Sequence, residues 1–169
     1  MALNARKKTD KVDAKVLAEL AVMGWYKPIY RKTGKDREMR TYLTAREGIV
    51  SSATKIKNTI RGLLKAHGVV LIKRVDGDEF SNRVKESIKG LPEIVKSALE
   101  MLLEAWEKLD FQKHEMYKKL RKIAKKDKTA ERLMTVPGVG PATALCFSST
   151  ISKTNRFKDK KHVASYIGL

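Results

Sequence analysis

Residues 93–126, EIVKSALEMLLEAWEKLDFQKHEMYKKLRKIAKK, contain the longest helical pattern of this chain. It follows Pro92 directly, and apolar side chains recur in it at every third or fourth position, the spacing that lines one face of an α-helix. A helix of this length is typical of an antiparallel helical hairpin or a coiled coil. The stripe consists of Val95, Leu99, Leu102, Trp106, Leu109, Met116, Leu120 and Ile123, with Lys113 as its only polar member.

Charge is distributed unevenly along this tract. Residues 85–110 carry six acidic and four basic side chains, whereas residues 111–132 carry nine basic and three acidic ones. Nucleic-acid phosphates attract clusters of Lys and Arg. One end of the predicted rod is therefore suited to nucleic acid, and the other end is not.

The flanking segments are also mainly helical. A helix is predicted over residues 11–23, with Thr9 or Asp10 as its cap and Gly24 at its end, followed by an extended link over residues 25–35. A second amphipathic helix is expected from Asp36 to His67. Its apolar stripe is Ile49, Ala53, Ile56, Ile60, Leu63 and Leu64, and Arg46, Lys55, Lys57, Arg61 and Lys65 lie mostly off it.

The remaining segments are shorter. Residues 69–80, which begin with the apolar run Val69 to Ile72, are expected to form a loop or a short strand. Residues 129–169 are expected to form a helix, a tight turn, a second helix, a basic link and a last short helix. The abrupt end at Leu169 leads us to expect a truncated chain. The predicted fold class is mainly α.

The composition points to a polyanionic partner. The 169 residues carry 37 Lys and Arg against 19 Asp and Glu, a net charge of +18 that is spread over the whole chain. Such an excess fits nucleic acid or an anionic membrane surface. We expect no membrane span, because no apolar run approaches the ~20 residues that one requires. The single cysteine and the lack of a secretory signal favour a reducing cytoplasm.

The strongest local motif is the turn from Val136 to Ala144, VPGVGPATA, with apolar residues on both sides. It matches a helix-hairpin-helix. Gly138 and Gly140 would supply backbone angles and a close approach that a Cβ forbids. Pro141 suits the first turn of a helix, whose free N–H groups can hold a phosphate oxygen. The alternative is a helical corner without a ligand. The prolines on both sides and the net charge favour contact with DNA.

Asp10 and Asp13 form the second motif. On a helix, carboxylates three residues apart point the same way and could share a Mg²⁺ or Mn²⁺ ion. In the alternative, Asp10 caps the helix and Asp13 completes a capping box. The spacing alone favours the cap. The histidines show no metal-ligand spacing, and the serines, among them Ser148 and Ser152, show no setting for a nucleophile.

Three blocks together resemble a known family. They are Lys8-Thr9-Asp10-x-x-Asp13-Ala14, then Lys57-Asn58-x-x-Arg61-Gly62-Leu63-Leu64 with His67-Gly68, and finally Leu133 to Pro141 with Arg156-Phe157 and Ala164 to Leu169. In order and spacing they resemble the DEDD insertion-sequence transposases, the group that includes Piv invertases and bridge-RNA-guided recombinases.

The resemblance implies a domain plan and a chemistry. Residues 1–35 would be the C-terminal remnant of a RuvC-like, RNase-H-like domain with its linker, residues 36–128 a helical coiled-coil region, and residues 129–169 the start of a C-terminal transposase domain. Asp10 and Asp13 would then be the last two of four acids that bind Mg²⁺ for catalysis, which reverses the capping preference. The two earlier acids and the family's serine motif fall outside this sequence. We therefore expect a fragment that is inactive by itself.

The expected function is DNA transposition or site-specific recombination in a prokaryotic cytoplasm, at the nucleoid. The expected partners are DNA, a guide RNA and a second copy bound through the coiled coil, with no membrane. The alternatives are a non-catalytic basic helical DNA- or RNA-binding module and a structural protein on RNA. The residues expected to contact DNA are Gly138, Val139, Gly140, Ala142, Lys153, Arg156 and Lys158.

Overall fold

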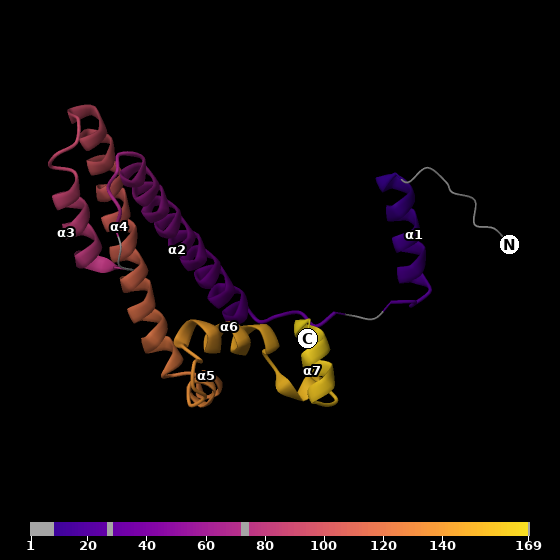
Figure 1. The fold of residues 1–169 in the computed structure, drawn as a ribbon. Helices are drawn as coiled ribbons and strands as arrows, with labels where there is room; N and C mark the ends of the chain where they lie inside the picture. Colours follow the sequence, from indigo (N-terminus) through magenta and orange to yellow (C-terminus); the bar gives the residue numbers. More distant parts are fainter. Residues whose placement is uncertain (1–8, 27–28, 72–74, 169) are drawn as a thin grey trace. The chain divides into compact units, whose positions relative to one another are not determined.

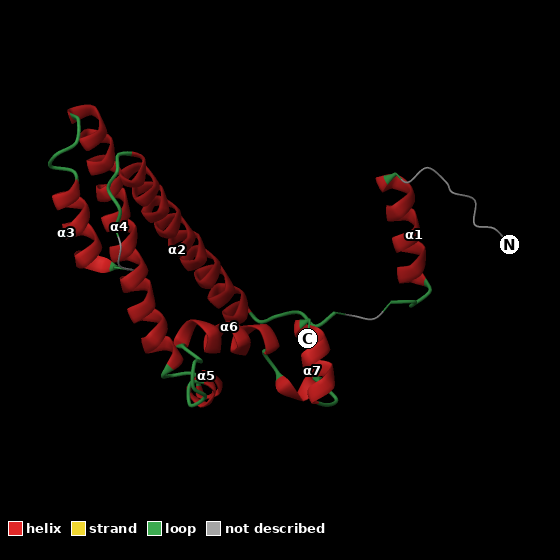
Figure 2. Cartoon of the chain, in the orientation of Figure 1, coloured by secondary structure: helices red, strands yellow, loops and turns green. Residues whose placement is uncertain are grey.

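Helices account for almost all of the regular structure. The computed structural model describes residues 9–26, 29–71 and 75–168, which contain seven α-helices, one 3₁₀ helix and no strand (Figure 2). Lys8, Ile72 and Leu169, which belong to the motifs above, lie outside these residues. The chain divides into two compact units between Lys32 and Thr33. The mainly helical prediction is confirmed.

The first unit contains a single described helix, α1, from Asp10 to Val22. Gly24 follows it with a φ of +69°, a left-handed conformation that favours glycine and ends the helix as predicted. None of the residues of α1 is buried, and Val16 and Leu17 of its apolar face are exposed. This unit therefore has no core of its own among its described residues.

Two long helices dominate the second unit. Helix α2 (Gly34–Ala66) and helix α4 (Glu93–Ala124) run in opposite directions, lie side by side at the end next to α3 and diverge toward α6 (Figure 1). Helix α2 begins with a complete capping box between Thr33 and Asp36 and continues through Gly48 without a break. The stripe predicted on α4 faces α2 and α3, so the same chain covers most of it.

Helix α3 (Gly77–Ser87) was not predicted. The expected loop over residues 69–80 is correct for residues 69–71 and 75–76, but the chain turns helical at Gly77. Phe80 and Val84, one turn apart, are fully buried against α4, where the ring of Phe80 meets that of Trp106 edge to face at 4.7 Å. The burial of these side chains explains why a short segment with only weak helical periodicity forms a helix here.

The main core lies at this end of the helix pair. It is built from α2, α3 and α4 and comprises Ala53, Ile60, Leu64, Val75, Phe80, Val84, Ile88, Leu99, Leu103 and Trp106. Lys57 and Arg61, expected mostly off the apolar stripe of α2, are half-buried beside this core. The ammonium of Lys57 lies 4.9 Å from the centre of the Phe80 ring and bonds Asp76 at 2.8 Å. These two cations belong to the packing of this end.

The last part of the chain folds across the other end of the pair. Helix α5 (Lys128–Leu133), a turn and helix α6 (Pro141–Ile151) follow α4, and α6 packs on both α2 and α4. A 3₁₀ turn, η1 (Thr154–Arg156), and helix α7 (Lys160–Ile167) complete it. The second core is small, and its buried members are Leu120, Ala124, Ala130, Ala144 and Leu145.

Candidate nucleic-acid interface

Asp10 and Asp13 both lie in the first turn of α1. Thr9, rather than Asp10, caps the helix, because its side-chain oxygen accepts a hydrogen bond from Val12 N–H at 3.4 Å. The capping alternative for Asp10 is therefore wrong, and both carboxylates are exposed. The described residues contain no group of three or more His, Cys, Asp or Glu side chains that could hold a metal ion. Within the described chain, this pair offers two oxygen ligands one helical turn apart.

The turn between α5 and α6 has one conformationally special glycine. Gly138 has a φ of +86°, in the left-handed region, whereas Gly140 is the extended N-cap of α6 with φ −88° and ψ 172°. The prediction that Gly140 needs unusual backbone angles is wrong. A Cβ at Gly140 would meet nothing within 4 Å, so the space above the start of α6 is open. Pro141 occupies the first helical position, as predicted.

Lys153, Arg156 and Lys158 do not share one environment. Lys153 and Lys158 are exposed. Arg156 is half-buried, and its guanidinium lies 4.1 Å from the centre of the Phe157 ring and 4.3 Å from that of Tyr166. Its Nε also donates to the carbonyl of Ile151 at 3.2 Å. Arg156 thus ties η1 to α6 and α7, a packing role that the sequence did not reveal.

The densest positive charge lies where α4 passes into α5, next to the turn. Residues 118–132 carry eight basic and two acidic side chains, a net charge of +6. Lys119, Lys122, Lys125, Lys126 and Lys128 are all exposed. We call residues 118–132 the basic end. Exposed cations beside an open helix start form an arrangement that binds phosphate backbones without reading sequence.

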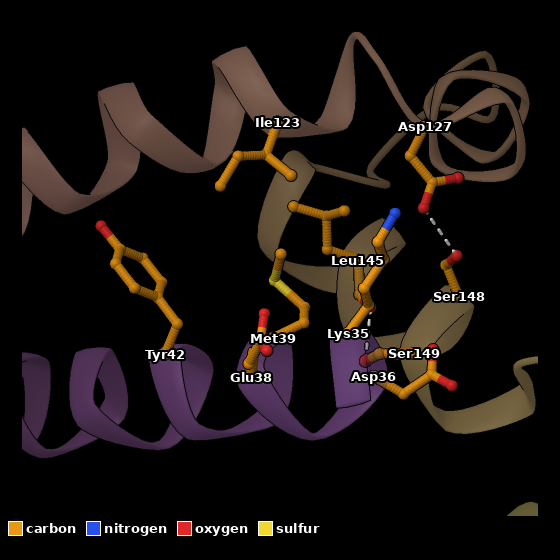
Figure 3. A pocket seen from close by; sticks show the side chains of 10 residues that line it. All are labelled: Lys35, Asp36, Glu38, Met39, Tyr42, Ile123, Asp127, Leu145, Ser148 and Ser149. Carbon is orange, nitrogen blue, oxygen red and sulfur yellow. Dashed lines mark hydrogen bonds between the residues drawn. The ribbon is translucent and has the colours of Figure 1, made fainter. Parts of the chain in front are cut away.

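Two serine–carboxylate contacts hold α6 in place. Ser148 Oγ donates to Asp127 Oδ2 at 2.9 Å, while the other oxygen of Asp127 caps α5 (Figure 3). Ser152 Oγ donates at 2.7 Å to Asp36, the capping-box acid of α2. Neither contact was predictable from the sequence, because the partners lie 21 and 116 residues apart. Both serines join elements of the fold.

A hollow of about 400 Å³ lies beside the contact between Ser148 and Asp127, and Asp36 lines it from α2 (Figure 3). Tyr42 closes one side, and its hydroxyl donates to the carbonyl of Met116 on α4. Burial raises the pKa of Tyr42, so this hydroxyl remains protonated at neutral pH. Asp36 and Asp127 both belong to helix caps, so their carboxylates hold helices together at this hollow.

Comparison of the sequence with known proteins finds one family at both ends of the chain. A model described as "Transposase", of the DEDD type of IS110, matches residues 2–68. A second model, described as "Transposase IS116/IS110/IS902 family", matches residues 130–169. The two matches follow the order of the blocks at the two ends of the chain. The chain belongs to this family of transposases.

Curated relatives of the family match nearly the whole chain. The transposase of insertion sequence element IS1111A from Coxiella burnetii is 26% identical over 164 residues, which cover 96% of this chain and 45% of the relative. A protein of Pseudomonas aeruginosa, whose name assigns it to the family 20 transposases, is 22% identical over 96% of this chain and 49% of its own length. The chain spans about half the length of the curated relatives it matches. No solved structure matches it.

Proposed function

We propose that this chain is the part of an insertion-sequence transposase that binds duplex DNA during transposition and recombination. The observation that carries the proposal is the basic end, next to the open start of α6. Membership of a transposase family supports DNA as the polyanion. The described helices include none long and apolar enough to cross a membrane. With DNA as the partner, we expect the protein in the cytoplasm, at the nucleoid.

The direct test is the affinity for a fluorescent duplex over a range of salt concentrations. We expect little sequence preference and a steep salt dependence, with log K falling by about 0.9 per phosphate contact for each unit of log salt. Affinity that barely changes between low and moderate salt would refute DNA binding through the basic end. Structured RNA in a parallel titration tests the alternative of an RNA-binding module and the use of a guide RNA.

A matched pair of glycine variants tests the turn. Gly140→Val keeps an allowed backbone conformation but fills the open space above the start of α6, so we expect weaker DNA binding by a stable protein. Gly138→Val strains a left-handed residue and should reduce stability as well. Lys89 is exposed and lies far from the turn in the sequence, so Lys89→Ala should change neither DNA affinity nor stability. Parent-like binding by Gly140→Val would identify the turn as a simple corner.

We further propose that Asp10 and Asp13 supply two ligands to a catalytic divalent ion in the complete transposase. Their exposure on one face of α1 and their hard oxygen donors suit Mg²⁺. When bound, the ion would polarise the scissile phosphate and activate the attacking group. Two exposed carboxylates hold an ion too loosely for that chemistry. We therefore expect no metal-dependent nicking of supercoiled plasmid by this chain, with an Asp10→Ala, Asp13→Ala double variant as the control.

We also propose that two copies of the chain associate through α4. The contact would use the exposed face of α4, because the chain itself covers the predicted apolar stripe. Ile94, Met101 and Phe111 are 82%, 69% and 67% exposed on the outer side of α4. In an antiparallel second copy, the acidic first half of α4 would face the basic second half of its partner. Sedimentation of the parent and of Phe111→Glu at tens of micromolar, a range chosen for roughly micromolar affinities, provides the test. A monomeric parent would refute this interface.

A further inference from the structure

A groove of about 570 Å³ between α2, α6 and α7 contains an arginine with an unusual environment. Its walls are mostly apolar, with Leu43 and Val50 from α2, Phe147 from α6 and Ile167 from α7. Arg46, also on α2, lines the groove together with Ala142 and Thr143 from the first turn of α6. All of these residues belong to the second unit of the chain.

Arg46 is half-buried without a partner for its inner nitrogen. Its Nε is fully buried and makes no hydrogen bond within the described chain. Leaving a buried donor unpaired is destabilising, and such groups are rare in folded proteins. Arginine also remains charged at any ordinary pH. A leucine would suit the apolar walls, so we expect Arg46 to cost stability at this position.

The first turn of α6 brings further donors to the same groove. The backbone N–H groups of Ala142 and Thr143 precede the first internal hydrogen bonds of the helix and have no partner within it. The start of a helix also carries partial positive charge. Arg46 from α2 and the first turn of α6 thus line one groove, and an anion is the ligand that suits the charge of both.

We propose that Arg46 and the first turn of α6 together hold one backbone phosphate of duplex DNA. The inference rests on the proposed function and adds to it a contact from α2, outside the turn and the basic end. Arginine is the side chain whose planar fork best fits a phosphate. The remaining volume of the groove, with its apolar walls, takes the deoxyribose next to that phosphate. Glu47, which also lines the groove, opposes the anion.

The test compares Arg46→Leu with Lys55→Leu, which removes an exposed charge from the same helix outside the groove. Unfolding in denaturant and the salt dependence of binding to a fluorescent duplex are measured for both. For Arg46→Leu we expect a midpoint of unfolding equal to or above that of the parent, because the unpaired donor is gone. The slope of log K against log salt should fall by about 0.9, the value for one lost contact. Lys55→Leu should leave the slope nearly unchanged.

A third variant tests the same groove in the opposite direction. Glu47→Gln removes the opposing charge, so it should bind DNA several-fold more tightly than the parent. If the parent binds DNA and Arg46→Leu has the slope of the parent, the phosphate contact is refuted while the proposed function stands. If Arg46→Leu unfolds at markedly lower denaturant, Arg46 has a structural role and the inference is equally refuted. If the parent does not bind duplex DNA at all, the proposed function fails as well.

Discussion

The two ends of the α2–α4 pair differ in both charge and packing. Residues 76–107, which we call the acidic end, carry eight acidic and four basic side chains, a net charge of −4 that Lys55, Lys57, Arg61 and Lys65 of the neighbouring stretch of α2 offset, whereas the basic end carries +6. Together with this stretch of α2, the acidic end encloses Phe80 and Trp106 in a core of ten buried residues. The core at the basic end has five buried residues, three of them alanine.

Under the proposed function, this difference assigns the stability of the molecule to one end and the binding of phosphates to the other. Hydrophobic stabilisation grows with the apolar area that is buried, so the large side chains at the acidic end should contribute most of it. At the basic end, like charges repel one another in the free protein and lose that repulsion when they meet phosphates.

The largest expected effect is on the core of the acidic end. Trp106→Ala should reduce the free energy of unfolding by about 3–5 kcal/mol, because it removes a fully packed ring. Leu120→Ala, at the basic end, should cost about 2–3 kcal/mol, because fewer large side chains surround it. Denaturant unfolding of both variants measures the difference. A larger loss for Leu120→Ala would reverse the comparison.

The second prediction concerns charge at the basic end. Replacing Lys119, Lys122, Lys125 and Lys126 with Gln should lower DNA affinity by about tenfold or more at moderate salt and make the salt dependence shallower, by about 0.9 for each lost contact. The stability of the free protein should not fall. The matched control replaces four lysines at or next to the acidic end, namely Lys85, Lys89, Lys96 and Lys108. An equal loss of affinity in the control would show that only net charge matters.

The third prediction concerns the joint that holds α6. Asp127→Ala removes both the cap of α5 and the acceptor for Ser148, so it should cost about 1–2 kcal/mol of unfolding free energy. Ser148→Ala removes only the contact between helices and should cost about half as much. Thermal unfolding of the two variants separates the contributions. Equal losses would mean that the cap contributes nothing.

The smallest expected effect is a dependence of stability on pH at the acidic end. The hydrogen bond from Lys57 lowers the pKa of Asp76 below its ordinary 3.8. A lowered pKa stabilises the fold above the ordinary value, and this stability is lost as the pH falls through the lowered one. Because Asp76 is 68% exposed, the contribution should stay below about 1 kcal/mol. In Asp76→Asn, the free energy of unfolding should therefore fall less between pH 5 and roughly pH 2 than it does in the parent. Denaturant unfolding of both proteins at several pH values in this range measures the difference.

The sequence predicted the elements that depend on local periodicity. Helices α1, α2 and α4 carry regular apolar stripes, and their positions were correct to within a few residues. Helix α3 was missed, because Phe80 and Val84 form too short a pattern to stand out beside Asp76 and Gly77, which are typical of a loop. Burial against α4 decides its structure, and burial against a distant segment leaves little local signal.

The residues of the candidate interface were predictable only in part. The charge of the basic end and the Pro141 position follow from the sequence alone. Arg46 resembled any other cation off the apolar stripe of α2, because its groove forms only when α6 and α7 pack there. Arg156, which was predicted to contact DNA, lies against the ring of its neighbour Phe157 and that of Tyr166, and the second of these contacts depends on the packing of α7.

The chain contains two tryptophans, one in each unit, and they offer an optical readout of folding. Trp106 is 2% exposed and lies against Phe80, whereas Trp25 is 77% exposed. An indole in an apolar environment emits at shorter wavelength than one in water. The shift of emission during unfolding should therefore report on the second unit, with Trp25 as a nearly constant background. Trp25→Phe would then provide a protein whose intrinsic fluorescence follows the α2–α4 core alone.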